Sequence, residues 1–147
     1  MRHVLLTLVT SILLGCSPSA SDTFSEGMAA YQNENYATAF PLISNAAQQG
    51  DVNAMAIFGV MHLFGHGTPV NGLEAEKWLR RASDTGFTGA QSTLGIMYAT
   101  GVGVERDLGE AQRLLKLAAE KGDKHAIAVL EQISTNKPIQ PKPGKTL

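Results

Sequence analysis

The chain repeats itself every 36 residues, and this internal period constrains its fold more than any other feature. Two complete units, at 52–87 and 88–123, share small and apolar residues at the same offset: Ala54, Gly59, Gly65, Gly67, Ala75, Leu79, Ala82 and Gly86 recur as Ala90, Gly95, Gly101, Gly103, Ala111, Leu115, Ala118 and Gly122. Partial units at 23–51 and 124–133 flank them. A period of this length is typical of solenoids, in which each unit buries its apolar face against its neighbours.

Each unit has the pattern of two helices joined by a glycine turn. Before the Gly-x-Gly of the second unit, Ala90, Leu94 and Tyr98 share one helical face; after it, a second face holds Ala111, Leu114, Leu115 and Ala118. The 15 glycines and an aromatic content of 6% also favour close-packed helices over strands. The sequence therefore predicts an all-α solenoid of antiparallel helix pairs.

The second helix of each unit carries start and stop signals. Asn71 and Asp107 are expected N-caps, and a glutamate three residues later, Glu74 or Glu110, would complete a capping box. Glycines 50, 86 and 122 are expected to take the left-handed conformation at helix ends.

The repeat pattern resembles a known family. Ala-x3-Leu-Gly-x2-Tyr-x2-Gly-x-Gly-Val, followed by Asp-x3-Ala and Ala-Ala-x2-Gly, is similar to the Sel1-like repeat, a relative of the tetratricopeptide repeat. Residues 88–123 match nearly throughout, whereas 52–87 depart at Phe58 and His62. The segment 24–50 resembles a tetratricopeptide unit. The resemblance implies an α-α superhelical solenoid that binds a protein partner.

The N-terminus has the features of an export signal. A short positive start precedes an apolar run from Val4 to Leu14, which is too short to span a bilayer. The run ends in Leu-Leu-Gly-Cys at residues 13–16, which resembles the lipobox of bacterial lipoproteins and implies acylation of Cys16, the only cysteine. Residues 1–15 would be removed, and residues 16–22 would form a flexible tether. The alternatives are an ordinary secretory signal and a buried N-terminal helix. Ser17 in place of an aspartate implies, by the family's sorting rule, the outer membrane facing the periplasm.

The sequence offers little for catalysis or for cofactors. His62 and His66 are four residues apart, but a turn is expected at Gly65 and would break the shared helical face that a zinc site needs, so no metal site is predicted. The Gly-x-Gly segments lack the Lys-Ser/Thr of a phosphate-binding loop, and no catalytic triad pattern is present. Since Arg2 is the only charged residue among the first 15, the remainder holds 11 basic and 13 acidic residues, which does not favour nucleic-acid binding.

A binding surface is expected on the concave side, which the first helix of each unit lines in tetratricopeptide solenoids. The partner-binding residues predicted there are Val60, Leu63, Phe64, Ile96, Ala99 and Thr100. This apolar strip is typical of a peptide or helix groove. The alternative is that neighbouring helices or the C-terminal tail cover it.

These features predict a lipid-anchored cell-envelope adaptor. An alternative is an immunity protein that neutralises a toxic envelope effector such as a phospholipase. A remote alternative is penicillin binding or β-lactamase activity, which a cysteine-rich branch of the family implies but this chain does not match. Residues 134–147 hold Pro138, Pro141, Pro143 and three lysines, and are expected to be a disordered tail, with contact to an acidic surface as the alternative.

Overall fold

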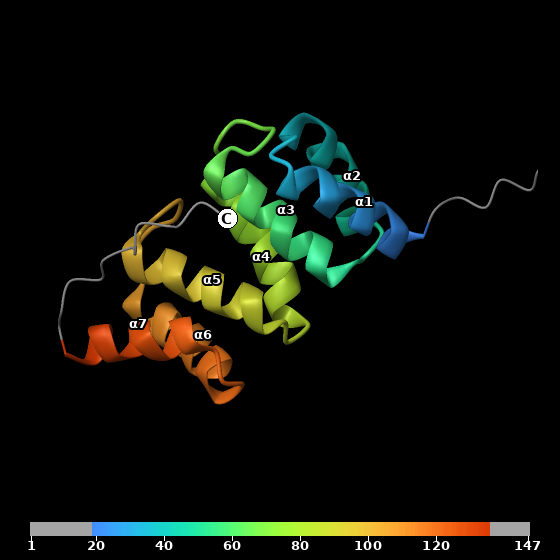
Figure 1. Ribbon diagram of the computed structural model, residues 1–147. Coiled ribbons are helices and arrows are strands. Elements are labelled where there is room, and N and C mark those ends of the chain that lie inside the picture. Colours follow the sequence, from blue (N-terminus) through green and yellow to red (C-terminus); the bar gives the residue numbers. More distant parts are fainter. Residues whose placement is uncertain (1–18, 136–147) are drawn as a thin grey trace, which may run out of the picture.

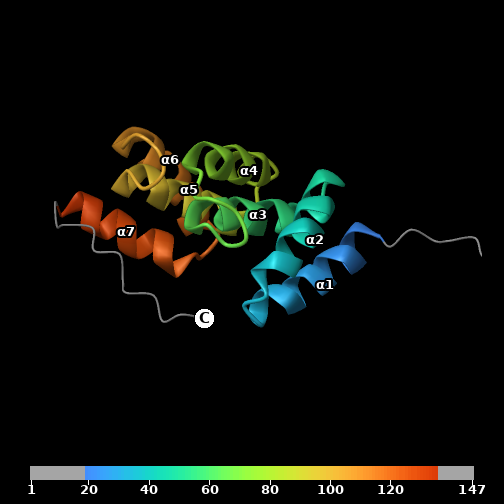
Figure 2. The same ribbon diagram turned by 90° about the horizontal axis from the view of Figure 1, so that it is seen from above.

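The computed structural model describes residues 19–135, which fold into helices without any strand (Figure 1). The helices are α1 Ala20–Gln32, α2 Tyr36–Gln48, α3 Val52–Phe64, α4 Gly72–Asp84, α5 Thr88–Thr100, α6 Leu108–Glu120 and α7 Lys124–Ser134. Three antiparallel pairs, α1–α2, α3–α4 and α5–α6, stack in chain order, and α7 packs on α5 and α6 at the end of the stack (Figure 2). The predicted all-α solenoid of helix pairs is confirmed. Over the described range, no helix has the length and apolar character needed to cross a membrane.

The first helix begins earlier than the sequence analysis expects. Ser19 is the N-cap of α1, its hydroxyl accepts from the backbone N–H of Asp22 at 3.2 Å, and the Asp22 carboxylate accepts from the Ser19 N–H at 3.4 Å. The flexible tether predicted for residues 16–22 is therefore wrong for residues 19–22, because this capping box satisfies the first N–H groups of a helix. At the other end, Ser134 belongs to α7 and not to the predicted tail. Cys16, the export signal predicted for residues 1–15, and residues 136–147 lie outside the described residues.

The predicted N-caps are confirmed, but the predicted capping boxes do not form. The side chains of Asn71 and Asp107 accept from the backbone N–H of Glu74 and Glu110, at 3.1 and 3.0 Å. The N–H groups of both caps donate instead to carbonyls of the preceding helix, Asn71 to His62 at 2.8 Å and Asp107 to Tyr98 at 3.0 Å. In each cap, the backbone N–H that the glutamate side chain would have accepted from is already hydrogen-bonded to the preceding helix.

The helix ends follow the glycine pattern. Gly50, Gly86 and Gly122 have φ values of +97°, +87° and +84°, so the predicted left-handed conformation is confirmed. These glycines end the second helix of each pair and turn the chain into the next pair.

The core lies between the helices of each pair and between successive pairs. The two faces predicted for the 88–123 unit are both buried: Ala90, Leu94 and Tyr98 on α5, and Ala111, Leu114, Leu115 and Ala118 on α6. The alanines among these residues leave room for the large side chains that fill the centre, which include Ile43, Leu79 and Leu115.

One position sets how closely the two helices of a pair approach. The eighth residue of the first helix is Gly27 in α1, Gly59 in α3 and Gly95 in α5. A Cβ at these glycines would lie 2.7–2.8 Å from a side-chain carbon of the partner helix, Ile43, Leu79 or Leu115. The eighth residue of α7 is Glu131, which is exposed. α7 therefore lacks the small residue that permits the close approach seen in the three pairs.

Candidate functional site

The predicted groove residues divide into an accessible set and a buried set. Phe64 is 60% exposed, and Val60, Ile96 and Thr100 are partly exposed. Leu63 and Ala99 are only 8% and 1% exposed, so these two of the predicted partner-binding side chains are not accessible at the surface. The accessible stripe of α3 runs through positions 53, 57, 60 and 64, and the same stripe of α5 runs through positions 89, 93, 96 and 100.

The next repeat explains why Leu63 is buried. The turn between α5 and α6 passes over it, and a Cβ at Gly103 would lie 2.9 Å from Leu63 Cδ1. On α5, the Arg106 side chain folds back to donate to the Ala99 carbonyl at 3.0 Å. Helical periodicity alone places both residues beside the groove, but the curvature of the stack determines which neighbours are covered.

Large apolar side chains are also exposed at one edge of the stack. We call this the turn edge: the connections 33–35, 65–71 and 101–107, the adjoining helix ends, and the C-terminal end of α7, which lie on the same side of the molecule (Figure 1). On this edge Phe64, Val70, Leu73 and Val102 are 60%, 68%, 76% and 52% exposed. Val70, Leu73 and Val102 were not predicted as surface residues of a site, although each is an apolar residue inside or beside a turn, which is the sequence signal for such an edge.

Aromatic side chains gather at the same edge, where the first two helix pairs meet. We call Tyr31, Tyr36, Phe64 and His66 the aromatic cluster. The rings of Tyr36 and His66 are stacked, 4.3 Å apart and 7° from parallel, and Tyr31 Oη lies 2.9 Å from His66 Nδ1. Phe64 approaches His66 with ring centroids 5.9 Å apart. Burial raises the pKa of the Tyr31 hydroxyl, with the neighbouring Tyr36 adding to the effect.

His62 and His66 have different surroundings. His66 stacks on Tyr36, whereas His62 lies between the ring edges of Phe40 and Phe58, at centroid distances of 5.6 and 4.7 Å. His62 Nδ1 is buried without a hydrogen-bond partner, and burial lowers the pKa of this imidazole. Within residues 19–135, no three His, Cys, Asp or Glu side chains are grouped so that they could hold a metal ion.

A polar cluster surrounds Tyr98, which occupies in the next repeat the position that His62 has in this one. The hydroxyl of Tyr98 is hydrogen-bonded to both Arg80 and Glu76, and Arg80 also contacts Glu110 at 3.3 Å. Glu110 in turn accepts from Arg113 at 2.8 Å, and this hydrogen bond lowers the pKa of the Glu110 carboxyl. The cluster joins α4, α5 and α6, so its role is to hold two repeats together.

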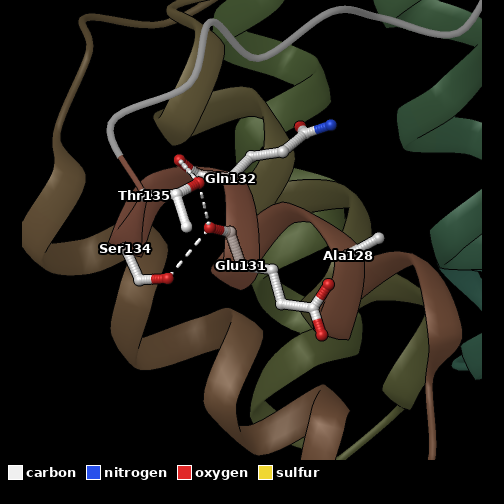
Figure 3. A pocket seen from close by; sticks show the side chains of 5 residues that line it. All are labelled: Ala128, Glu131, Gln132, Ser134 and Thr135. Carbon is white, nitrogen blue, oxygen red and sulfur yellow. Dashed lines mark hydrogen bonds between the residues drawn. The ribbon is translucent and has the colours of Figure 1, made fainter.

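The polar side chains that line the hollow at the end of α7 do not point toward a common centre. Its lining residues all belong to the last turns of this helix and its cap: Ala128, Glu131, Gln132, Ser134 and Thr135. Figure 3 shows the Glu131 carboxylate and the Gln132 amide pointing away from each other. The hydroxyls of Ser134 and Thr135 donate to the Glu131 backbone carbonyl, at 2.9 and 2.8 Å. These groups cannot act together on one ligand.

Comparisons with known proteins agree with this geometry. The sequence model described as the Sel1 repeat matches residues 52–87 and 89–123. Among solved structures, a Sel1 repeat protein from Oxalobacter formigenes is similar, with 27% identity and a TM-score of 0.68, over 77% of this chain and 88% of that one. A second similar structure is c5321, a protective antigen of uropathogenic Escherichia coli with an SLR fold; identity is 26% and the TM-score 0.70. The match covers 83% of this chain but only 28% of that protein. The search of curated protein sequences gave no match.

The two matched segments are the helix pairs α3–α4 and α5–α6 with their connecting turns. Residues 52–87 and 89–123 are therefore two Sel1 repeats, in a chain whose fold is similar to that of solved Sel1 repeat proteins.

Proposed function

We propose that this chain is a lipid-anchored adaptor of the bacterial cell envelope that binds a protein partner through its first-helix stripes. The observation that carries the proposal is the accessible stripe on α3 and α5, on which Val60, Phe64, Ile96 and Thr100 leave apolar and hydroxyl surface open to solvent. Sel1 repeats generally serve as non-catalytic scaffolds for protein–protein interaction. Exposed apolar strips of this kind are typical of sites that receive a peptide or a helix.

The electrostatic character of the stripe supports a neutral, apolar partner segment. No Lys, Arg, Asp or Glu occupies the stripe positions 53, 57, 60 and 64 or 89, 93, 96 and 100. The ion pairs of the described chain lie instead on α4 and α6, as in the Arg80–Glu110 contact. Binding to the stripe would therefore depend on buried apolar area and vary little with salt concentration.

Substitutions on the stripe test the proposal. Phe64→Glu and Thr100→Glu introduce a charge at exposed or half-exposed positions, and each should greatly weaken capture of the partner from membranes that carry the anchored protein. Gln112→Glu places the same charge on the exposed face of α6 and serves as the matched control. If both stripe variants retain the partner while their thermal unfolding is unchanged, the stripe is not the binding surface.

The anchor is a separate part of the proposal. It depends on the lipobox ending at Cys16, with Ser17 next to it favouring the outer membrane. Cells that express the full chain should incorporate radiolabelled palmitate into it, and Cys16→Ser should abolish the incorporation. Equal labelling of the two proteins would exclude this anchor without affecting the stripe.

A further inference from the structure

The turn edge is a continuous surface, because its connections touch one another. The turn 101–107 lies against the start of α4: a Cβ at Gly72 would collide with the Gly103 backbone, 1.8 Å from its carbonyl oxygen. The turn 65–71 lies in the same way against α2, where a Cβ at Gly67 would be 2.6 Å from the Tyr36 carbonyl oxygen. The edge therefore runs without a break from Val102 past Leu73 and Val70 to the aromatic cluster.

This edge exposes more apolar surface than other parts of the described chain. Leu73, Val70, Phe64 and Val102 are the four most exposed of the large apolar side chains in residues 19–135. None of them supports the core, and Leu73 is 76% exposed in the first turn of its helix. Apolar side chains that gather along one line usually mark a surface that something covers.

The C-terminal segment leaves the fold at this same edge. α3, α5 and α7 are the first helices of successive units, and Figures 1 and 2 show their C-terminal ends on one side of the molecule. Since α7 packs on α5, the axes of these two helices are about one helix spacing, 8–10 Å, apart, and the C-terminal end of α5 leads into the turn 101–107. The eight residues 136–143 would span about 25 Å in a polyproline II conformation, which is more than two helix spacings.

The chemistry of the segment complements the edge. Residues 136–147 contain three prolines, Ile139 and three lysines, and no acidic residue. Proline-rich segments dock on aromatic surfaces because their backbone is already extended and loses little entropy on binding. The edge carries the exposed acidic residues Glu34, Glu105 and Asp107 against one base, Arg106. Opposite charge therefore favours the same placement as apolar contact does.

We infer that residues 136–143 of this chain bind along its own turn edge, with Pro138 and Ile139 over Val102 and Leu73 and with Pro141 and Pro143 at the aromatic cluster. The segment covers the exposed apolar line and protects it from other chains. This placement does not rest on the adaptor function. It shares Phe64 with the stripe, but its contacts at Val70, Leu73 and Val102 lie outside the stripe and can be tested separately.

A spin label at the far end of the segment tests the placement. A chain that begins at residue 17 keeps every residue of the described fold and has no cysteine, so Thr146→Cys allows one nitroxide label. The methyl signals of Val70, Leu73 and Val102 should lose intensity when the label is oxidised. Val52, at the start of α3 on the opposite edge, should keep its intensity.

A matched variant separates docking from free motion of the segment. Replacing Pro138, Pro141 and Pro143 with serine keeps the length and the charge of the segment but removes its preference for the extended conformation. Among the three residues observed, Val70 is the one furthest along the edge from the end of α7. The loss of intensity at its methyl groups should then be largely reversed. An equal loss in the proline and serine chains would overturn the inference, because a freely moving segment gives that result. Chains without the nitroxide can also be mixed with chains that carry it. If the methyl signals of the chains without the nitroxide lose intensity, the inference is overturned, since the segment would then be binding a second copy.

Discussion

His62 and Tyr98 occupy equivalent positions in successive repeats, but only the Tyr98 side chain has hydrogen-bond partners in the helix pair before it. Tyr98 meets Glu76 and Arg80 of α4. The residues 36 positions earlier on α2 are Phe40 and Ser44, and the Ser44 hydroxyl is already bound by Gln48 at 3.0 Å. His62 therefore faces aromatic rings, and its Nδ1 remains without a partner. At this equivalent position the first interface between repeats is apolar, and the second is polar.

We expect the stability of the protein to depend on pH through His62. Burial holds its pKa below the ordinary value of 6.5, against a smaller opposing effect of Glu74. The folded state therefore prefers the neutral imidazole. Above pH 6.5 the imidazole is neutral in both the folded and the unfolded state, so it adds no pH dependence to stability. As the pH falls below 6.5, the unfolded chain binds the proton first, and the free energy of unfolding decreases until the pH has passed the lower pKa of the folded state.

His62→Phe should remove this part of the pH dependence, because a phenyl ring fits between Phe40 and Phe58 and takes up no proton. Urea unfolding at pH 7.5 and pH 5 would measure it. His125→Gln is the control, since His125 is exposed. The same loss of stability on acidification in wild type and in His62→Phe would refute the assignment.

The close approach at Gly95 should be costly to change. Gly95→Ala places a Cβ 2.8 Å from Leu115 Cγ and 3.3 Å from the Leu115 backbone nitrogen, so the helices must move apart, at a cost of about 1–3 kcal/mol. Glu131→Ala alters the equivalent residue of α7, which is exposed, and should change stability by about 0.5 kcal/mol or less. Chemical denaturation of both variants gives the comparison. Similar effects at the two positions would mean that helix propensity, and not packing, governs this site.

Gly67 should tolerate substitution less well than Gly122. Both have positive φ, +75° and +84°, so alanine costs about 1–2 kcal/mol at either position. A Cβ at Gly122 meets nothing within 4 Å, whereas at Gly67 it would meet the Tyr36 carbonyl at 2.6 Å. Gly67→Ala should therefore lower the unfolding free energy further than Gly122→Ala and shift the ring resonances of His66. Equal losses, with His66 unmoved, would show that the turn does not rest on α2.

The Tyr98 hydroxyl should contribute to the polar interface. Tyr98→Phe removes a group bonded to both Arg80 and Glu76, and about 0.5–1.5 kcal/mol of stability should be lost. Tyr36→Phe is a suitable control, because the Tyr36 hydroxyl has no hydrogen bond to another described residue. Thermal unfolding at neutral pH would separate the two. If the thermal stability of Tyr98→Phe equals that of the wild type, apolar packing and not the Tyr98 hydroxyl stabilises this interface.

The sequence by itself determined the helix pairs, their order and the starts of the two complete repeats at residues 52 and 88. The 36-residue offset, the alanine and leucine faces, the caps at Asn71 and Asp107 and the glycines at 50, 86 and 122 are local signals, and each acts through the residues beside it in the chain. Local geometry within one repeat is fixed by such signals because a helix pair buries its own contact face.

Only the tertiary structure decided which surfaces remain open. Leu63 is covered by the turn 101–107 of the next repeat, and Arg106 folds back onto Ala99, while Phe64 stays exposed; helical periodicity does not predict these contacts. The donors of Asn71 and Asp107 bind carbonyls of the preceding helix and so displace the expected glutamates. The aromatic cluster joins Tyr31 and Tyr36 to His66, some 30 residues later in the chain, and it exists only because Gly67 lets one turn rest on the neighbouring pair. Contacts between repeats depend on how far each pair rotates against the last, and that rotation results from the packing of all the side chains between them.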